Sequence, residues 1–174
     1  MPAYNEAQSI DGAVRRTLLA LQETAESYEV IVVDDGSVDN TYEKMRSLAS
    51  EDEHVRLVRN DINMGKGAAV KHAAGFVRGD SVIVIDADME IAPEQLQMYL
   101  RALRDYDLCI GSKRHPNSVY NAPLVRKFLS VTFNTTVRIL TGVRVADSQT
   151  GLKAMARSSV LFTNFYAAER KGTE

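Results

Sequence analysis

The chain has 174 residues, of which 45% are hydrophobic and 25% charged, a composition typical of a globular domain rather than of a disordered or fibrous chain. A single cysteine excludes an intramolecular disulfide, the three scattered histidines fit no zinc motif, and no apolar run reaches the length of a membrane span. No basic segment leads into an apolar stretch at the start, so we expect no signal peptide and a cytosolic chain.

Charge is divided unevenly along the chain. Residues 1–110 carry 11 basic and 20 acidic side chains, a net charge of −9, whereas residues 111–174 carry 10 basic and 3 acidic, a net charge of +7. The basic part favours contact with phosphate or with an anionic membrane surface, and a chance arrangement of solvated faces is the alternative. Aromatic residues do not alternate with the basic ones, so we expect no nucleic-acid partner.

Apolar runs predict four strands buried on both faces, at residues 28–34, 54–59, 81–85 and 106–111. Helix start signals and helical spacing predict helices at residues 7–25, 39–50, 66–78 and 93–104. This alternation predicts an α/β fold, a mostly parallel sheet flanked by helices, in which ligands bind at the carboxyl ends of the strands. Because no repeat or linker interrupts the chain, we expect a single domain over residues 1–174.

The first residues of the chain have a sequence typical of a loop. Residues 2–6 read Pro-Ala-Tyr-Asn-Glu and lead directly into the first predicted helix. Because a sheet of this kind usually opens with a strand, we expect the first strand to be missing from this chain.

Two acidic residues, Asp34 and Asp35, end the first predicted strand and are followed by a tight turn at Gly36 and Ser37. At the carboxyl edge of the sheet, such a pair could accept hydrogen bonds from a base or a ribose. The alternative is turn and cap chemistry, with Asp39 as the N-cap of the next helix. The residues alone leave both interpretations open.

A glycine-containing loop, residues 63–67, opens the third predicted helix. Free N–H groups at a helix N-terminus and the charge of Lys66 suit a phosphate group. The spacing matches neither the Walker pattern nor the dinucleotide-binding pattern, so a simple helix entry is the alternative.

Asp86 and Asp88 follow the strand at residues 81–85 and project to the same side if the chain stays extended. Two carboxylates so close repel each other unless a cation or a proton lies between them. Oxygen ligands at an exposed strand end favour Mg²⁺ or Mn²⁺ bridging a diphosphate, and Glu90 could add a further ligand. The alternative is a polar turn before Pro93.

These segments occur in an order that resembles family 2 inverting glycosyltransferases of the GT-A fold. The segments are PAYNEA, VVDDGSVDNT, NMGKGAA, IDADME and GSKRHP, followed by DSQTGLKAM at residues 147–155. The last of these, with RKFLS at residues 126–130, resembles the dolichyl- and polyprenyl-phosphate hexosyltransferases, closest to the glucose-transferring branch and next to the mannose-transferring one. The resemblance covers nearly the whole chain.

The resemblance implies a nucleotide-sugar donor, UDP-glucose or GDP-mannose, bound within residues 1–110. It implies donor contacts from these residues: Pro2, Tyr4, Glu6, Asp35, Gly65 and Lys66. It further implies that Asp86 and Asp88 hold Mg²⁺ or Mn²⁺ on the donor diphosphate, with Asp88 counted among the catalytic residues. Glu90 stands where mannosyl enzymes often have a glutamine ligand.

The resemblance places the acceptor, a dolichyl or polyprenyl phosphate, on the basic part at residues 111–174. The matching residues are Arg114, Arg126 and Ser130, and Asp147 would orient the acceptor or an arginine. A structural cap before Gly151 is the alternative for Asp147. The implied enzyme is a hexosyltransferase bound peripherally to the cytoplasmic side of a membrane, and an apolar stripe at residues 123–141 could lie in the bilayer interface or pack on the sheet.

Two other functions stay open at this stage. The chain could be a non-catalytic nucleotide-sugar-binding remnant, or a family 2 enzyme that transfers sugar to a saccharide hydroxyl and needs a general-base carboxylate. Family members begin with a strand before the PAYNE segment and continue beyond DSQTGLKAM, so we expect a chain truncated at both ends.

Overall fold

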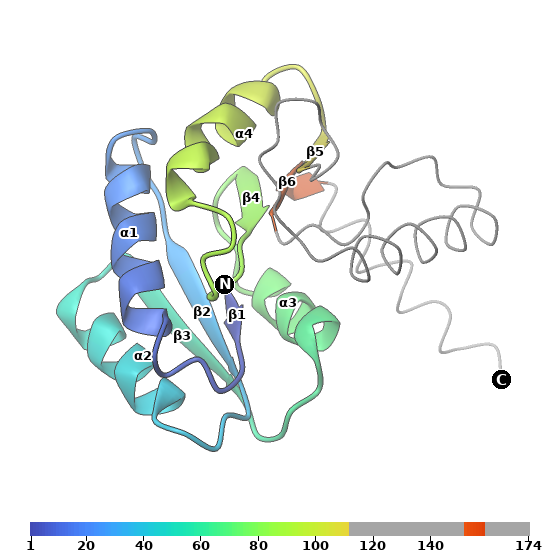
Figure 1. The fold of residues 1–174 in the computed structure, drawn as a ribbon. Coiled ribbons are helices and arrows are strands. Elements are labelled where there is room, and N and C mark those ends of the chain that lie inside the picture. The colour runs from blue at the N-terminus through green and yellow to red at the C-terminus, as the bar shows by residue number, and fades with distance from the viewer. Residues whose placement is uncertain (112–151, 159–174) are drawn as a thin grey trace, which may run out of the picture. The chain divides into compact units, whose positions relative to one another are not determined.

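The computed structural model describes residues 1–111 and 152–158. Its first sheet has three parallel strands in the order β1-β2-β3, namely β1 (Pro2–Ala3), β2 (Val30–Asp35) and β3 (Val55–Asn60). The connecting helices α1 (Ile10–Gln22) and α2 (Thr41–Glu51) pack against each other, and Figure 1 shows both on one side of the strands, with α3 (Lys66–Ala74) on the other. Two successive crossovers in one direction place their helices on the same face because such crossovers are right-handed.

The second sheet has the order β4-β6-β5, from β4 (Ser81–Val84), β6 (Lys153–Ala156) and β5 (Leu108–Ile110). The strands β4 and β6 are antiparallel, with Ser81 opposite Ala156 and Val84 opposite Lys153. The 3₁₀ turn η1 (Pro93–Gln95) and helix α4 (Leu96–Ala102) lead from β4 to β5. All four predicted strands and all four predicted helices are therefore present, although the strands form two sheets and one pairing is antiparallel.

Two strands, β1 and β6, were not predicted from the sequence. Residues 2–6 were expected to be a loop, but Pro2 and Ala3 pair in parallel with Val33 and Asp34 of β2, and the Met1 carbonyl accepts a hydrogen bond from Val33 N at 2.9 Å. A strand of two residues is too short to show periodicity. The strand β6, with the sequence Lys-Ala-Met-Ala, has no β-branched or aromatic residue and so gives no strand signal.

The hydrophobic core lies between the first sheet and its helices. Ile10 and Val14 of α1, Val32 of β2 and Met45 of α2 are fully buried. The buried positions of α1 recur at helical spacing, as expected for a helix with one face on a sheet. Burying each aliphatic side chain contributes about 1.5–3 kcal/mol, so this packing fixes the strand ends that carry the polar residues described below.

A cavity of about 560 Å³ is lined by residues of α1, β2, α3 and β4, among them Leu21, Ile31, Val70 and Val82. Most of its lining residues are apolar, and Glu29, Arg78 and Asp80 also line it. In the two ranges that the structure describes, no helix is long and apolar enough to cross a membrane.

Candidate functional site

A polar cleft of about 200 Å³ lies at the carboxyl ends of the strands. We use "polar cleft" for the space lined by Pro2, Ala3, Tyr4, Glu6, Asp35, Lys66, Asp86, Ala87 and Asp88. Seven of these nine were predicted as site residues from separate segments of the sequence, and the remaining predicted donor contact, Gly65, hydrogen-bonds to Asp35. The fold thus brings the donor-side candidates together, while the role of each stays a prediction.

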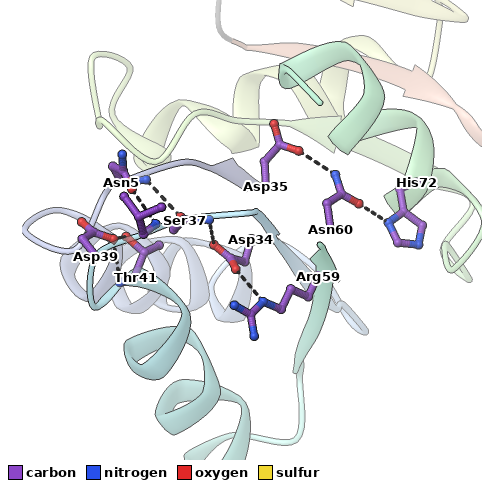
Figure 2. Close-up of polar contacts among 10 residues, drawn as sticks. Asn5, Asp34, Asp35, Ser37, Asp39, Thr41, Arg59, Asn60 and His72 are labelled. Atoms are coloured by element: carbon purple, nitrogen blue, oxygen red, sulfur yellow. Dashed lines mark hydrogen bonds and ion pairs between the residues drawn. The ribbon is translucent and has the colours of Figure 1, made fainter. Parts of the chain in front are cut away.

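The two acidic residues at the end of β2 face different surroundings. In the parallel ladder Asp34 pairs with Arg59, and Asp35 pairs with Asn60. Because successive strand residues point to opposite faces, the two carboxylates diverge, as Figure 2 shows. Asp34 is fully buried, accepts a hydrogen bond from Ser37 N at 3.1 Å and lies 3.2 Å from Arg59 Nε. Asp34 therefore stabilises the turn after β2 and pairs with Arg59, and of the two carboxylates only Asp35 lines the polar cleft.

Asp35 is held by three donors. Its Oδ1 accepts from Asn60 Nδ2 at 2.6 Å and from Met64 N at 3.1 Å, and its Oδ2 accepts from Gly65 N at 2.8 Å. Burial of this carboxyl acts to raise its pKa, but the hydrogen bonds from Asn60, Met64 and Gly65 outweigh burial and hold the pKa below its ordinary value. Asp35 is therefore ionised near neutral pH, and one lone pair of Oδ2 is left for a ligand donor.

The loops around Asp35 are closely packed at Gly36. Its φ is +70°, and a Cβ there would lie 2.5 Å from the backbone carbon of Ile62 and 2.6 Å from the nitrogen of Asn63. Only glycine allows this approach, because any side chain would meet fixed backbone. Gly36 therefore lets the loop after β2 touch the loop that precedes α3.

Asn5 ties the start of the chain to the same turn. Its backbone nitrogen donates to Ser37 Oγ at 3.0 Å, and its side-chain Oδ1 accepts from Val38 N at 3.0 Å (Figure 2). Asn5 has a φ of +56°, a left-handed conformation that asparagine tolerates better than most residues. These bonds hold the segment that carries Tyr4 and Glu6 against the end of β2.

Two side chains near helix starts have local partners. Asp39 was predicted as the N-cap of α2, but the cap is Asn40, and Asp39 Oδ1 instead accepts from Thr41 N at 2.9 Å. Glu6, an expected donor contact, lines the polar cleft, and its Oε2 accepts from the Ser9 hydroxyl at 2.5 Å. Both carboxylates thus stabilise helix starts in this structure.

Lys66 and Asp86 form an ion pair within the polar cleft. Lys66 begins α3, and Asp86 comes two residues after β4. The Lys66 Nζ lies 2.6 Å from Oδ1 and 2.8 Å from Oδ2 of Asp86. The predicted phosphate-binding lysine and one predicted metal ligand are therefore direct neighbours.

The acidic loop after β4 does not gather all three expected metal ligands. Asp88 is exposed and its Oδ1 accepts from Glu90 N at 3.0 Å, while Met89 between them has a φ of +55°. Asp86 and Asp88 line the polar cleft and Glu90 does not. No group of three His, Cys, Asp or Glu side chains within residues 1–111 and 152–158 is placed to hold a metal ion. Glu90 does not line the polar cleft, and its contribution to a metal site stays a prediction.

The acceptor-side candidates lie outside the described residues. They are Arg114, Arg126, Ser130 and Asp147, and their roles stay predictions. Two residues that the sequence interpretation missed are Asn60 and His72, which form a hydrogen-bonded series with Asp35 (Figure 2). The sequence feature that could have identified Asn60 as a site residue is its position directly after the predicted strand at residues 54–59.

The sequence profile described as glycosyl transferase family 2 matches residues 1–161. The chain belongs to this family. Among curated members, dolichyl-phosphate β-glucosyltransferase ALG5A of Trichomonas vaginalis is 32% identical over 179 residues, which cover 94% of this chain and 54% of that protein. Undecaprenyl-phosphate mannosyltransferase of Micrococcus luteus is 34% identical over 178 residues, covering 99% of this chain and 71% of that protein.

The chain spans about half the length of several of the curated relatives that it matches. Its fold is shared with glucosyl-3-phosphoglycerate synthase of Mycobacterium tuberculosis, solved in complex with Mn²⁺ and uridine-diphosphate-glucose. That structure superposes with a TM-score of 0.64 at 24% identity, covering 90% of this chain and 54% of the other. The predicted GT-A fold, an α/β arrangement with a parallel sheet and flanking helices, is thus confirmed.

Proposed function

We propose that this chain carries the donor-binding part of an enzyme that transfers a hexose from a nucleotide sugar to a dolichyl or polyprenyl phosphate. The observation that carries the proposal is the polar cleft, in which Asp35, Lys66, Asp86 and Asp88 meet at the carboxyl ends of the strands. The names of the relatives support the substrate class, since one is a dolichyl-phosphate glucosyltransferase and another an undecaprenyl-phosphate mannosyltransferase.

The nucleoside end of the donor would bind at Asp35. Three protein donors fix this carboxylate, and the open lone pair of Oδ2 can accept a hydrogen bond from a base N–H or a ribose hydroxyl. Tyr4 is 43% exposed and lines the same cleft, so its ring is available to contact the nucleoside. Binding at Asp35 would place the diphosphate toward Lys66, whose ammonium attracts it.

The donor set of the polar cleft fits a hard divalent cation. Asp86 and Asp88 offer carboxylate oxygens, the ligands that Mg²⁺ and Mn²⁺ prefer, and two protein ligands leave room for water and phosphate oxygens. Bound there, Mg²⁺ or Mn²⁺ would neutralise negative charge on the departing diphosphate. The complex of the Mycobacterium tuberculosis enzyme with Mn²⁺ and uridine-diphosphate-glucose supports this choice of metal.

The transfer requires little acid–base catalysis from the protein. An oxygen of the acceptor phosphate attacks the anomeric carbon from the face opposite the nucleoside diphosphate, which leaves with the bonding electrons, and the configuration inverts. The acceptor phosphate is already anionic near neutral pH, so no general base is required. Lys66 can stabilise the charge that develops on the leaving group.

The acceptor would bind to the basic part of the chain, residues 111–174, with a net charge of +7. The proposed contacts are Arg114, Arg126 and Ser130, with Asp147 orienting an arginine or the acceptor. A basic surface would also attract the anionic membrane in which a polyprenyl phosphate is embedded. The proposed place of action is thus the cytoplasmic face of a membrane, bound peripherally.

A donor and acceptor panel tests the proposal with the full-length protein. Labelled UDP-glucose and GDP-mannose are each incubated with dolichyl phosphate, undecaprenyl phosphate or a free disaccharide, with Mn²⁺ or with EDTA. The expected result is label in the lipid fraction from one donor, lost in EDTA. Label on the disaccharide would indicate a saccharide-directed enzyme, and donor binding without transfer to any acceptor would indicate a non-catalytic remnant.

A further inference from the structure

A series of two short hydrogen bonds connects Asp35 to the surface of α3. Asn60 Nδ2 lies 2.6 Å from Asp35 Oδ1, and Asn60 Oδ1 lies 2.6 Å from His72 Nδ1 (Figure 2). Asn60 is 6% exposed and its bond to Asp35 is buried, whereas His72 lies at the surface and its bond to Asn60 is partly buried. The lining of the polar cleft includes neither Asn60 nor His72. The direct side-chain link from these two residues to the polar cleft therefore runs through Asp35.

The direction of each bond follows from chemistry. An ionised carboxylate only accepts hydrogen bonds, so the Asn60 amide must turn its NH₂ group toward Asp35. Its carbonyl oxygen then faces His72 and can only accept. The hydrogen must therefore sit on Nδ1 of His72. Protonation at Nε2 leaves this bond in place, because Nδ1 carries a hydrogen in both forms.

We propose that His72 is a positioning residue for the donor nucleotide, acting on Asp35 through Asn60. This inference rests on the proposed function, in which Asp35 accepts a hydrogen bond from the nucleoside. The His72 donor anchors the carbonyl end of Asn60, and the amide end of Asn60 fixes Asp35 Oδ1. The open lone pair of Asp35 Oδ2 is thereby aimed into the polar cleft.

The His72 ring is itself held in place on its helix. Phe76, in the turn that follows α3, lies against it with the ring centroids 5.6 Å apart. The guanidinium of Arg56 lies 6.0 Å from the Phe76 ring centroid and donates to the Phe76 carbonyl at 2.7 Å. This packing limits rotation of the imidazole and keeps Nδ1 directed at Asn60.

The chain offers a matched control in His54. Its Nδ1 lies 2.8 Å from Asp52 Oδ1, and its ring stacks on Tyr28 at 4.5 Å. Neither Asp52 nor Tyr28 lines the polar cleft. A substitution at His54 therefore removes a comparable local contact without touching the series that ends at Asp35.

Calorimetric titration with UDP and with GDP, in the presence of Mn²⁺, tests the inference on the full-length protein. Loss of one partly buried hydrogen bond predicts that His72→Leu binds the preferred nucleotide about fivefold to tenfold more weakly. His72→Asn should stay within about twofold of the wild type, since its side-chain NH₂ replaces the Nδ1 donor. His54→Leu should bind as the wild type does. Rescue by asparagine and not by leucine would assign the effect to the hydrogen-bond donor at residue 72 and not to the bulk of its side chain.

A second measurement concerns the free protein. Two-bond ¹H–¹⁵N correlation spectra of neutral His72 should show the hydrogen on Nδ1, with Nε2 unprotonated. A hydrogen on Nε2, or unchanged nucleotide affinity in His72→Leu, would overturn the inference while leaving the proposed function intact. A wild-type protein that binds neither UDP nor GDP would overturn the proposed function and this inference with it.

Discussion

Lys66 and Asp86 neutralise each other in the polar cleft, with the ammonium 2.6 Å and 2.8 Å from the two carboxylate oxygens. The pair joins the N-terminal end of α3 to the loop after β4, and Lys66 is 51% exposed. An ion pair of this exposure contributes only about 0–1 kcal/mol, so a ligand can rearrange it at little cost. A divalent metal ion at Asp86 would compete with the Lys66 ammonium for the same carboxylate. A diphosphate could bind the metal ion and the Lys66 ammonium at once.

Replacing the lysine should therefore have opposite effects on metal and donor. In Lys66→Met, we expect free Mn²⁺ to bind more tightly, by up to about fivefold, because the competing ammonium is gone. Nucleotide sugar should bind more weakly, because a charge that attracts the diphosphate is lost. Lys71→Met removes an exposed charge from the same helix and serves as the control. Titration with Mn²⁺ alone and then with donor measures both changes, and a parallel weakening of both would contradict the competition.

The acidic loop gives the second prediction. Asp88→Ala, and to a lesser extent Asp86→Ala, should abolish donor binding that depends on Mg²⁺ or Mn²⁺ while leaving the fold intact, because these side chains lie at a strand end. Glu90→Ala should have a smaller effect, since Glu90 does not line the polar cleft. Donor titrations with and without EDTA measure the dependence. Undiminished, EDTA-insensitive transfer by Asp88→Ala would exclude Asp88 as a metal ligand.

Asp35 should contribute to nucleotide affinity. Asp35→Ala is expected to weaken donor binding by about 1–3 kcal/mol, the usual effect of losing a hydrogen bond to a charged group. Asp61→Ala removes a nearby exposed carboxylate and serves as the control. Isothermal titration of both variants decides the matter, and an unchanged affinity in Asp35→Ala would restrict Asp35 to holding the loop at residues 63–65.

The lowered pKa of Asp35 also predicts how stability depends on pH. Its folded-state pKa lies below the unfolded value of about 3.9, so ionised Asp35 stabilises the fold above that pH. This stabilisation is lost as the pH falls through the folded-state pKa. The difference in unfolding free energy between the wild type and Asp35→Asn should therefore be largest near neutral pH and shrink below about pH 4. Urea unfolding at several pH values measures it, and a constant difference would contradict the assignment.

Gly36 should tolerate no side chain. Gly36→Ala places a Cβ within 2.6 Å of the backbone of residues 62 and 63, at a φ of +70°. Strain of this kind costs about 1–3 kcal/mol. Gly67→Ala is the matched control, because a Cβ there has no atom within 4 Å and alanine favours a helix. Thermal unfolding should show a lower Tm for Gly36→Ala only, and equal Tm values would refute the close approach of the two loops.

The sequence predicted four of the strands and all four helices of residues 1–111, because continuous apolar runs mark these strands and start signals with helical spacing mark the helices. It missed β1 and β6, which are too short or too weakly β-forming to give a signal, and it could not show that β6 pairs antiparallel with β4. The ordered motifs predicted most residues of the polar cleft. That Asp35 lines the cleft while Asp34 does not became clear only from the register of β2 against β3. The hydrogen-bonded series from Asp35 to His72 could not be predicted from the sequence either, because it joins side chains of β2, β3 and α3.

The last prediction concerns the basic part of the chain. Residues 123–141 place Leu124, Phe128 and Val131 at helical spacing near Arg126 and Lys127, a pattern suited to a bilayer interface as well as to packing on a sheet. Attraction to anionic lipid contributes about 1 kcal/mol for each basic residue near the surface and weakens as salt screens it. We therefore expect the full-length protein to adsorb to anionic vesicles in a salt-sensitive way.

The charge-reversal variant Arg126→Glu/Lys127→Glu tests this surface directly. It should lose most of its co-sedimentation with vesicles containing phosphatidylglycerol at low salt, and it should bind neutral phosphatidylcholine vesicles no differently from the wild type. Reversing Arg15 and Arg46 together provides a control with the same charge change, placed on α1 and α2. Binding that responds neither to salt nor to reversal at residues 126 and 127 would mean that the basic part does not face a membrane. The proposed assignment of Arg126 to the acceptor phosphate would then lose its physical basis, because the proposed lipid-linked acceptor would be embedded in that membrane.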